Sequence, residues 1–331
     1  MIELNHPWLF RYQINIGTNG ILYFDDKVQN YIKKNMHHLS LGITIDGNKE
    51  LHDKCRIDLD GKGSYDRAIA ALNHYSSTYD RYGLSKITIS PENISFFKQS
   101  LIDFIEKQHY ACIYSNCVYE KGWTIDHAKI LYKELKDFSD YLLNNNLQDK
   151  TYLSILDWPI GREYSELDRT FCGGNGEMIA LDVNGDIYPC IRYTPSSIGN
   201  PNLKFKIGDV DNGFIYNEEQ EERLKCLSCI SRRTQNATTE HCTDCPISEG
   251  CGDCAAYSYE VFGEVGHRTT YICDMHKARV LAAVYYKNLS YQKTGIKEPL
   301  AMNCPKEWAV PIIGEEEYNM LCDLANKSFE S

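Results

Sequence analysis

The sequence predicts an α/β protein in which alternating strands and helices precede a loop-rich, cysteine-rich domain with a β-hairpin. Over about the first 150 residues, short apolar runs alternate with stretches of helical periodicity. Further along, nine of the 14 cysteines fall between residues 172 and 273, where periodicity is weak. Within that region Asn184-Gly185 separates two alternating runs, which is the strongest short hairpin signal because both turn residues need positive φ.

The first part of the chain has the order expected of a parallel sheet with right-handed crossover helices. Ligands at such sheets bind where strands end, and Asn19-Gly20 and Asp46-Gly47 fall at two of these ends. The expected elements are a strand at 12–16, a helix at 26–38, a strand at 39–45, a helix at 64–82, a strand at 86–90, and helices at 93–109 and 124–145.

The second part begins with the hairpin, expected at 177–190. The polar stretch after Gly213 cannot bury enough apolar surface to order itself, so another group must hold it together. Helical spacing returns at 273–288, and the tail is expected to wrap the surface before a short final helix. We therefore expect domains at 1–150 and 165–290 and a C-terminal tail at 291–331.

Composition narrows the class of partner. The net charge of −11 argues against nucleic acid, since phosphate binding depends on an excess of Lys and Arg. No apolar run reaches the roughly 18–20 residues of a membrane span, and the N-terminus does not resemble a signal peptide. We therefore expect a cytoplasmic protein without a membrane partner. Thiols stay reduced in that compartment, where closely spaced cysteines are more often metal ligands than disulfides.

The spacing of the cysteines predicts metal sites. Cys242-x2-Cys245-x5-Cys251-x2-Cys254 places two C-x2-C pairs side by side, and each pair can bring two sulfurs to one centre. The other members of the cluster are Cys172, Cys190, Cys226, Cys229 and Cys273. Two four-sulfur sites would use eight of the nine, and spacing alone fits zinc and iron–sulfur equally. The remaining five cysteines lack such partners and are expected to be small buried hydrophobes.

The arrangement of these cysteines resembles the SPASM domain of radical SAM enzymes. The resemblance covers about a third of the chain and rests on Cys172-x12-Gly185-x4-Cys190, a gap, C-x2-C-x5-C, a further cysteine and a final Cys273. In that family the domain binds two auxiliary [4Fe–4S] clusters, which favours iron–sulfur over zinc.

Ligands carried over by position fall into two sets. Cys242, Cys245, Cys251 and Cys273 would ligate auxiliary cluster II, and Cys172, Cys190 and Cys254 would ligate auxiliary cluster I. The fourth ligand of cluster I would be Cys226 or Cys229, unless one iron stays open for a substrate thiolate. Two residues separate Cys251 from Cys254, where family members commonly have three.

An earlier segment supports the resemblance. Gly42-Ile43-Thr44-Ile45-Asp46-Gly47, then His52-Asp53 and Arg56, is similar to the fourth-strand segment of the radical SAM partial (β/α) barrel. The resemblance implies that S-adenosyl-L-methionine (SAM) binds at Asn19, Thr44, Asp46 and Arg56, with the guanidinium on the SAM carboxylate. Without the cysteine-rich neighbour, the segment would be interpreted as a strand–turn–helix junction with Asp46 as turn former.

One expected motif is absent. The sequence has no C-x3-C-x2-C spacing, the usual ligand set of the SAM-cleaving cluster, and no Gly-Gly-Glu stretch. The resemblance then implies an incomplete radical SAM barrel that begins near its third strand, followed by the SPASM domain. The chain would be the C-terminal portion of an enzyme, or work with a separate N-terminal radical SAM half, and alone it would make no radical.

The sequence around residues 245–254 and 273–279 resembles maturases of peptides with repeated cysteines. The implied activity is thioether (C–S) cross-linking of a ribosomally made peptide, after a 5′-deoxyadenosyl radical derived from SAM takes a hydrogen atom from it. The implied partners are a cysteine-containing precursor peptide and a reductant such as ferredoxin or flavodoxin. Two other interpretations stay open, a non-catalytic electron-transfer or peptide-binding subunit and a zinc-stapled structural domain.

Overall fold

The structure, a computed structural model, describes residues 12–79, 85–108, 112–164, 178–200, 205–214 and 242–330, and the single positions 172, 174, 202, 203, 218, 227 and 239. The chain forms two compact units. The first contains Met1–Cys117, Ile130–Asp157 and Leu289–Lys297, and the second contains Val118–Lys129, Trp158–Asn288 and Glu298–Ser331.

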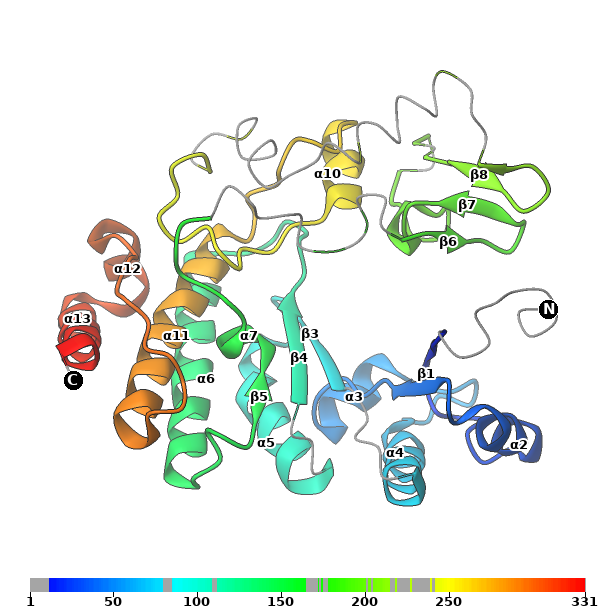
Figure 1. Ribbon diagram of the computed structural model, residues 1–331, viewed down its shortest axis with the longest axis horizontal. Coiled ribbons are helices and arrows are strands. Elements are labelled where there is room, and N and C mark those ends of the chain that lie inside the picture. Colours follow the sequence, from blue (N-terminus) through cyan, green and yellow to red (C-terminus); the bar gives the residue numbers. More distant parts are fainter. Residues whose placement is uncertain are drawn as a thin grey trace. The chain divides into compact units, whose positions relative to one another are not determined.

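The first unit is built on two short parallel sheets, which confirms the predicted α/β class (Figure 1). One sheet pairs β1 (Ile14–Thr18) with β2 (Leu39–Ile43), and the other orders β3 (Ser85–Ile89), β4 (Cys112–Cys117) and β5 (Tyr152–Leu153). The helices of this part are α2 (Asp26–Asn35), α3 (Lys49–Cys55), α4 (Tyr65–Tyr79), α5 (Phe97–Gln108) after the short η1 (Ile94–Phe96), α6 (Ile125–Asn144) and α7 (Ser154–Asp157).

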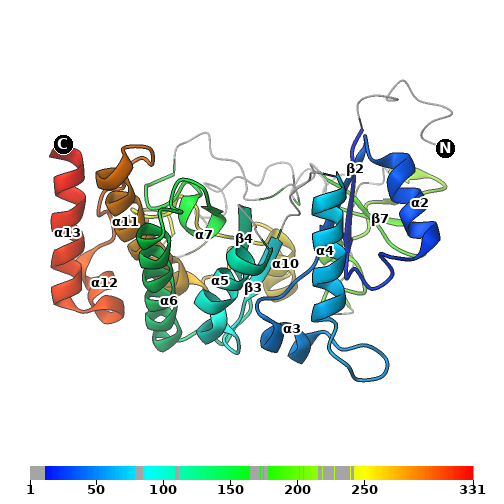
Figure 2. The ribbon, with the colours of Figure 1, turned by 90° about the horizontal axis from the view of Figure 1, so that it is seen from below.

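Hydrophobic burial holds these strands and helices together. Along β2 the buried side chains Leu39, Leu41 and Ile43 alternate with half-buried positions, as the period of a strand requires. On α5, Leu101 and Phe104 are fully buried. Figure 2 shows α4, α5 and α6 as a layer on one side of the strands. Each buried apolar Å² contributes about 25 cal/mol, so this unit is stabilised by its own core.

Several predicted boundaries differ from the structure. The strand expected at 12–16 is β1, two residues later, and the helix expected at 26–38 ends at Asn35, whose side-chain amide donates to the Tyr31 carbonyl oxygen at 2.8 Å. β4 was not predicted, because only Ile113 among its residues is fully buried and its sequence lacks an apolar run. Boundaries of this kind depend on tertiary contacts more than on local propensity.

The turn after β2 is fixed by polar side chains. Asn48 caps α3 by accepting from the Leu51 N–H at 3.0 Å, and Gly47 has φ +79° with no room for a Cβ. Ser64 directly precedes α4, but its hydroxyl donates to the Arg56 carbonyl oxygen at 3.0 Å. The Asp53 carboxylate accepts from the N–H of the first residue of α4 instead, at 2.9 Å.

The second unit contains the predicted hairpin. β6 (Ala180–Leu181) and β7 (Asp186–Tyr188) pair antiparallel around Asn184-Gly185, and the sheet continues through β8 (Gly208–Asp209) and β9 (Gly213–Phe214). Gly185 has φ +83°, but Asn184 does not have positive φ, so the expectation of positive φ at both turn residues is wrong. The Gly185 N–H donates to the Asp182 carbonyl oxygen at 3.1 Å, so the turn begins two residues before Asn184. The short η3 (Ile191–Tyr193) follows the hairpin, and α10 (Ala255–Phe262) and α11 (Cys273–Thr294) lie further along the chain.

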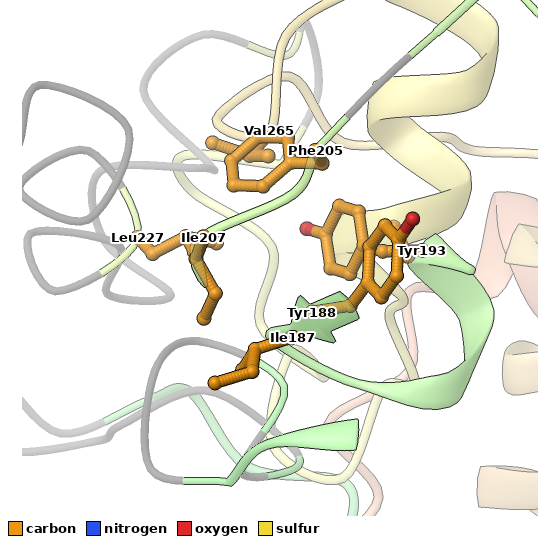
Figure 3. Close-up of a cluster of buried hydrophobic side chains, with 8 residues drawn as sticks. Ile187, Tyr188, Tyr193, Phe205, Ile207, Leu227 and Val265 are labelled. Atoms are coloured by element: carbon orange, nitrogen blue, oxygen red, sulfur yellow. The ribbon is translucent and has the colours of Figure 1, made fainter. Parts of the chain in front are cut away.

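A small hydrophobic cluster lies beside the hairpin (Figure 3). The rings of Tyr193 and Phe205 pack with centroids 4.7 Å apart, and Ile187 and Tyr188 extend the cluster from β7. Cys190 and Cys254 pack against its edge.

The C-terminal tail is more helical than predicted. It forms α12 (Lys306–Ile313) and the 16-residue α13 (Glu315–Glu330), where a single short helix was expected. Pro311 lies inside α12, so proline here did not mark a break. No helix among the described residues is long and apolar enough to cross a membrane.

Candidate metal centre

The structure brings four of the predicted ligands to one cavity in the second unit. Cys242, Cys245, Cys251 and Cys273 line a cavity of about 430 Å³. The first three lie on successive turns, in which the Ser248 N–H donates to the Cys245 carbonyl oxygen and the Cys251 N–H to the Ser248 carbonyl oxygen. Cys273 begins α11. We call these four residues the first thiol group.

Helix α11 holds the loop that carries this group. The buried His276 contacts the Ile247 carbonyl oxygen through Nε2 at 2.5 Å, which assigns the ring proton to Nε2. Three residues further along, Arg279 donates to the Gly250 carbonyl oxygen at 2.8 Å. Residues three apart share a helix face, so one face of α11 fixes both ends of the turn between Cys245 and Cys251.

A buried arginine lines the same cavity. Arg268 is 4% exposed and donates to the carbonyl oxygens of Cys251 and Gly252, both at 3.0 Å. Its backbone N–H donates to the Thr239 hydroxyl oxygen at 2.9 Å. A Cβ at position 252 would lie 3.1 Å from the Tyr119 ring, a tight contact. Arg268 therefore fixes a tightly packed segment and places a positive charge beside the thiols.

Burial controls the protonation of the thiols in the first thiol group. Burial, followed by the nearby Cys251 and Cys242, raises the pKa of Cys273 to about 12. The same cause raises the pKa of Cys242 and Cys245. Without a metal these thiols stay neutral at pH 7, and a metal ion must displace their protons to bind the thiolates.

A second thiol group forms from Cys172, Cys190 and Cys254. A Cβ at Gly174 would lie 3.4 Å from Sγ of Cys172 and 3.5 Å from Sγ of Cys190, so both thiols flank the same glycine. Burial raises the pKa of Cys254 to about 11, with Cys190 and Cys172 among the smaller causes. The three are therefore electrostatic neighbours.

The cysteines outside the two thiol groups are two predicted ligands and the five residues expected to be small hydrophobes. Cys226 and Cys229, the candidates for a fourth ligand of the second thiol group, lie outside the described residues. Of the cysteines expected to be small hydrophobes, Cys304 is buried, with its pKa raised by burial to about 12, whereas Cys55 is exposed. The others, Cys112, Cys117 and Cys322, are half-buried.

In the first unit, two strand ends carry the residues proposed for SAM. The Thr44 N–H donates to the Thr18 carbonyl oxygen at 2.8 Å, which brings the ends of β1 and β2 together. Asn19 is exposed, and its side chain accepts from the Ile21 N–H at 3.1 Å, within its own turn.

Asp46 and Arg56 are neighbours in this structure. The Arg56 Nε–H donates to the Asp46 carboxylate, and both side chains are partly exposed. Behind them the Asp46 N–H donates to His52 Nδ1 at 3.2 Å, so the His52 Nε2–H donates to the Ser64 hydroxyl oxygen at 3.1 Å. Burial lowers the pKa of His52 and keeps the ring neutral. The expected guanidinium is thus present at the strand end, already hydrogen-bonded to a carboxylate of the chain.

Sequence reasoning missed the side chains that hold the cysteine loop. Arg268 lies five residues before Cys273 in a polar run without periodicity, and nothing in the sequence distinguishes it from a surface arginine. His276 and Arg279 could have been found, because with Cys273 they repeat at a three-residue interval on one helix face.

Comparison with known proteins places the fold. No protein-family model matches the sequence. A cysteine-type anaerobic sulfatase-maturating enzyme of Clostridium novyi (strain NT) is 25% identical over 194 residues, 54% of this chain and 49% of that protein. The chain therefore spans about half the length of this curated relative.

Solved structures of anSMEcpe resemble the chain over most of its length. With bound AdoMet, one has a TM-score of 0.59 at 16% identity and covers 92% of this chain and 75% of its own. Another, with AdoMet and the Kp18Cys peptide, has a TM-score of 0.57 at 17% identity, over 85% and 75%. These relatives support the radical SAM part of the sequence resemblance, but not the thioether-forming subclass. The chain has the α/β fold of radical SAM maturases.

Proposed function

We propose that this chain binds two auxiliary [4Fe–4S] clusters and takes part in the radical SAM-dependent modification of a cysteine-containing, ribosomally made peptide. The observation that carries the proposal is the convergence of Cys242, Cys245, Cys251 and Cys273 on one cavity. The second thiol group would hold the other cluster. Such clusters supply one-electron transfer and can hold a substrate thiolate.

The arrangement favours a cluster over a single zinc ion. With Zn–S bonds of about 2.3 Å, four tetrahedral thiolates lie within roughly 4 Å of one another. Among the described residues, no group of three or more His, Cys, Asp and Glu side chains is placed to hold one metal ion. The four thiols of the first thiol group line a cavity of about 430 Å³, which leaves space for a group larger than a single ion, such as a [4Fe–4S] cluster.

SAM and a peptide are the proposed ligands of the intact system. Two observations support SAM, the strand-end placement of Thr44, Asp46 and Arg56 and the AdoMet bound in the structural relatives. The Kp18Cys peptide bound in one relative supports a peptide partner with a cysteine. We propose a thioether as the product, with a reductant such as ferredoxin or flavodoxin as electron donor.

Peptide binding tests this proposal. The reconstituted, reduced chain is mixed with a cysteine-containing peptide or its serine counterpart, and the cluster EPR spectrum is recorded. We expect only the cysteine peptide to change the spectrum, because a thiolate binds iron far better than a hydroxyl group. Identical spectra with both peptides would contradict a substrate-thiolate site.

A second assay tests whether SAM cleavage needs another polypeptide. With SAM and dithionite, the chain alone should yield no 5′-deoxyadenosine, since it has no C-x3-C-x2-C spacing. Formation of 5′-deoxyadenosine by the chain alone would show that a separate radical SAM half is unnecessary.

The curated relative favours a second candidate, maturation of a sulfatase cysteine. Mass spectrometry of a modified peptide separates the two. A C–S–C linkage between two residues of the peptide supports the thioether proposal. A chemically modified cysteine without such a linkage supports the second candidate, maturation of a sulfatase cysteine.

A further inference from the structure

Arg268 and Arg192, two arginines of the second unit, differ in where their charges lie. Arg268 is 4% exposed and lines the cavity of the first thiol group. Arg192, by comparison, is ion-paired with Glu120 and Glu260 and its side chain is about a third exposed. The Arg268 guanidinium donates to the carbonyl oxygens of Cys251 and Gly252, both at 3.0 Å.

A buried guanidinium at this place has an electrostatic consequence. A [4Fe–4S]²⁺ core with four thiolates carries a net charge of 2−, and reduction adds one more negative charge. A fixed cation stabilises the more negative form more strongly, and the effect is large where water is excluded. Net charge and hydrogen bonding are established determinants of cluster potential.

We propose that Arg268 raises the reduction potential of the cluster held by Cys242, Cys245, Cys251 and Cys273. This inference rests on the proposed function, because it requires a cluster at that site. Arg268 acts as a positioning residue that contributes charge, and it is not a ligand. Lys277 also lines the cavity. Solvent and a carboxylate screen its positive charge more strongly, because its side chain is more exposed and is paired with Asp274 at 2.8 Å.

The test is an EPR-monitored redox titration of the reconstituted full chain and three variants. Arg268→Met removes the charge, and Arg268→Lys keeps it with fewer donors. Arg279→Met is the matched control, because Arg279 also anchors the loop, through the Gly250 carbonyl oxygen, but does not line the cavity. Iron and sulfide are counted for every sample.

We expect Arg268→Met to lower one of the two midpoint potentials, with at least a tenfold change in the ratio of oxidised to reduced cluster at fixed potential, which is 59 mV for one electron. Arg268→Lys should restore most of the shift, and Arg279→Met should shift either potential much less than Arg268→Met does. An unchanged potential in Arg268→Met, or an equal shift in Arg279→Met, would overturn the proposal.

Loss of the cluster from Arg268→Met would still decide the question. Retention in Arg268→Lys would then support a requirement for charge, and equal loss from both would indicate a purely geometric role, contrary to the proposal. If the unmodified chain binds no iron and sulfide, the proposed function itself fails.

Discussion

The strand ends of the first unit and the cysteine loop of the second present polar ligands in different ways. Thr18 ends β1 and Thr44 follows β2, a strand whose side chains Leu39, Leu41 and Ile43 are buried. Cys245 and Cys251 lie on turns, and side chains of Arg268 and α11 hold the loop instead. The first arrangement is stable through hydrophobic burial, whereas the second needs a bound group to be complete. A perturbation should therefore affect the two regions unequally.

Metal removal should give the largest contrast. After chelation under reducing conditions, we expect amide hydrogen exchange to accelerate strongly across residues 242–273, because metal binding there supplies folding energy. Residues of β2 and α4 should keep their protection. Equal loss of protection in both regions, or in neither, would contradict the comparison.

A core substitution should produce the reverse pattern. Leu101→Ala removes a fully buried side chain and should lower the free energy of unfolding by about 2–5 kcal/mol, with iron content unchanged. Leu59→Ala is the matched control, because Leu59 is fully exposed, and it should change stability by less than about 0.5 kcal/mol. Denaturant unfolding measures both, and similar effects of the two variants would refute the assigned core.

Loss of a loop anchor should have a smaller effect, confined to the second unit. His276→Phe keeps an aromatic ring but removes the donor to the Ile247 carbonyl oxygen, which should cost about 1–3 kcal/mol. We expect faster iron loss to a chelator, measured by absorbance, while the unfolding of the first unit is unaffected. Iron release at the normal rate would show that this contact does not hold the loop.

The smallest expected effect is a pH dependence of the first unit. Burial lowers the pKa of His52 below its ordinary 6.5, with Asp46 opposing the shift. Below pH 6.5 the unfolded chain binds a proton that the folded chain does not, so stability should fall as the pH falls. His52→Gln should flatten this dependence between pH 7 and 5 in thermal unfolding. If the stability of His52→Gln depends on pH as steeply as that of the unmodified chain, groups other than His52 cause the dependence.

The same contrast explains what the sequence could predict. Alternating apolar residues identified β2, and Asn184-Gly185 identified the hairpin, since both signals are local. The cysteine spacing predicted metal sites, whereas the division of the thiols into two sets came from the family resemblance. Arg268 was not predictable, because its role depends on a contact with Cys251, 17 residues away in a stretch without periodicity. The helix α12 was not predicted, and its interior contains Pro311, a residue that usually interrupts a helix.

The most direct test of the two-cluster proposal is the count of iron and sulfide per chain after anaerobic reconstitution, with zinc assayed alongside. We expect about eight iron and eight sulfide, the sum of two four-iron clusters, falling to about four of each in Cys273→Ala and unchanged in Cys322→Ala. Stoichiometric zinc without sulfide, or an unchanged iron count in Cys273→Ala, would contradict the account.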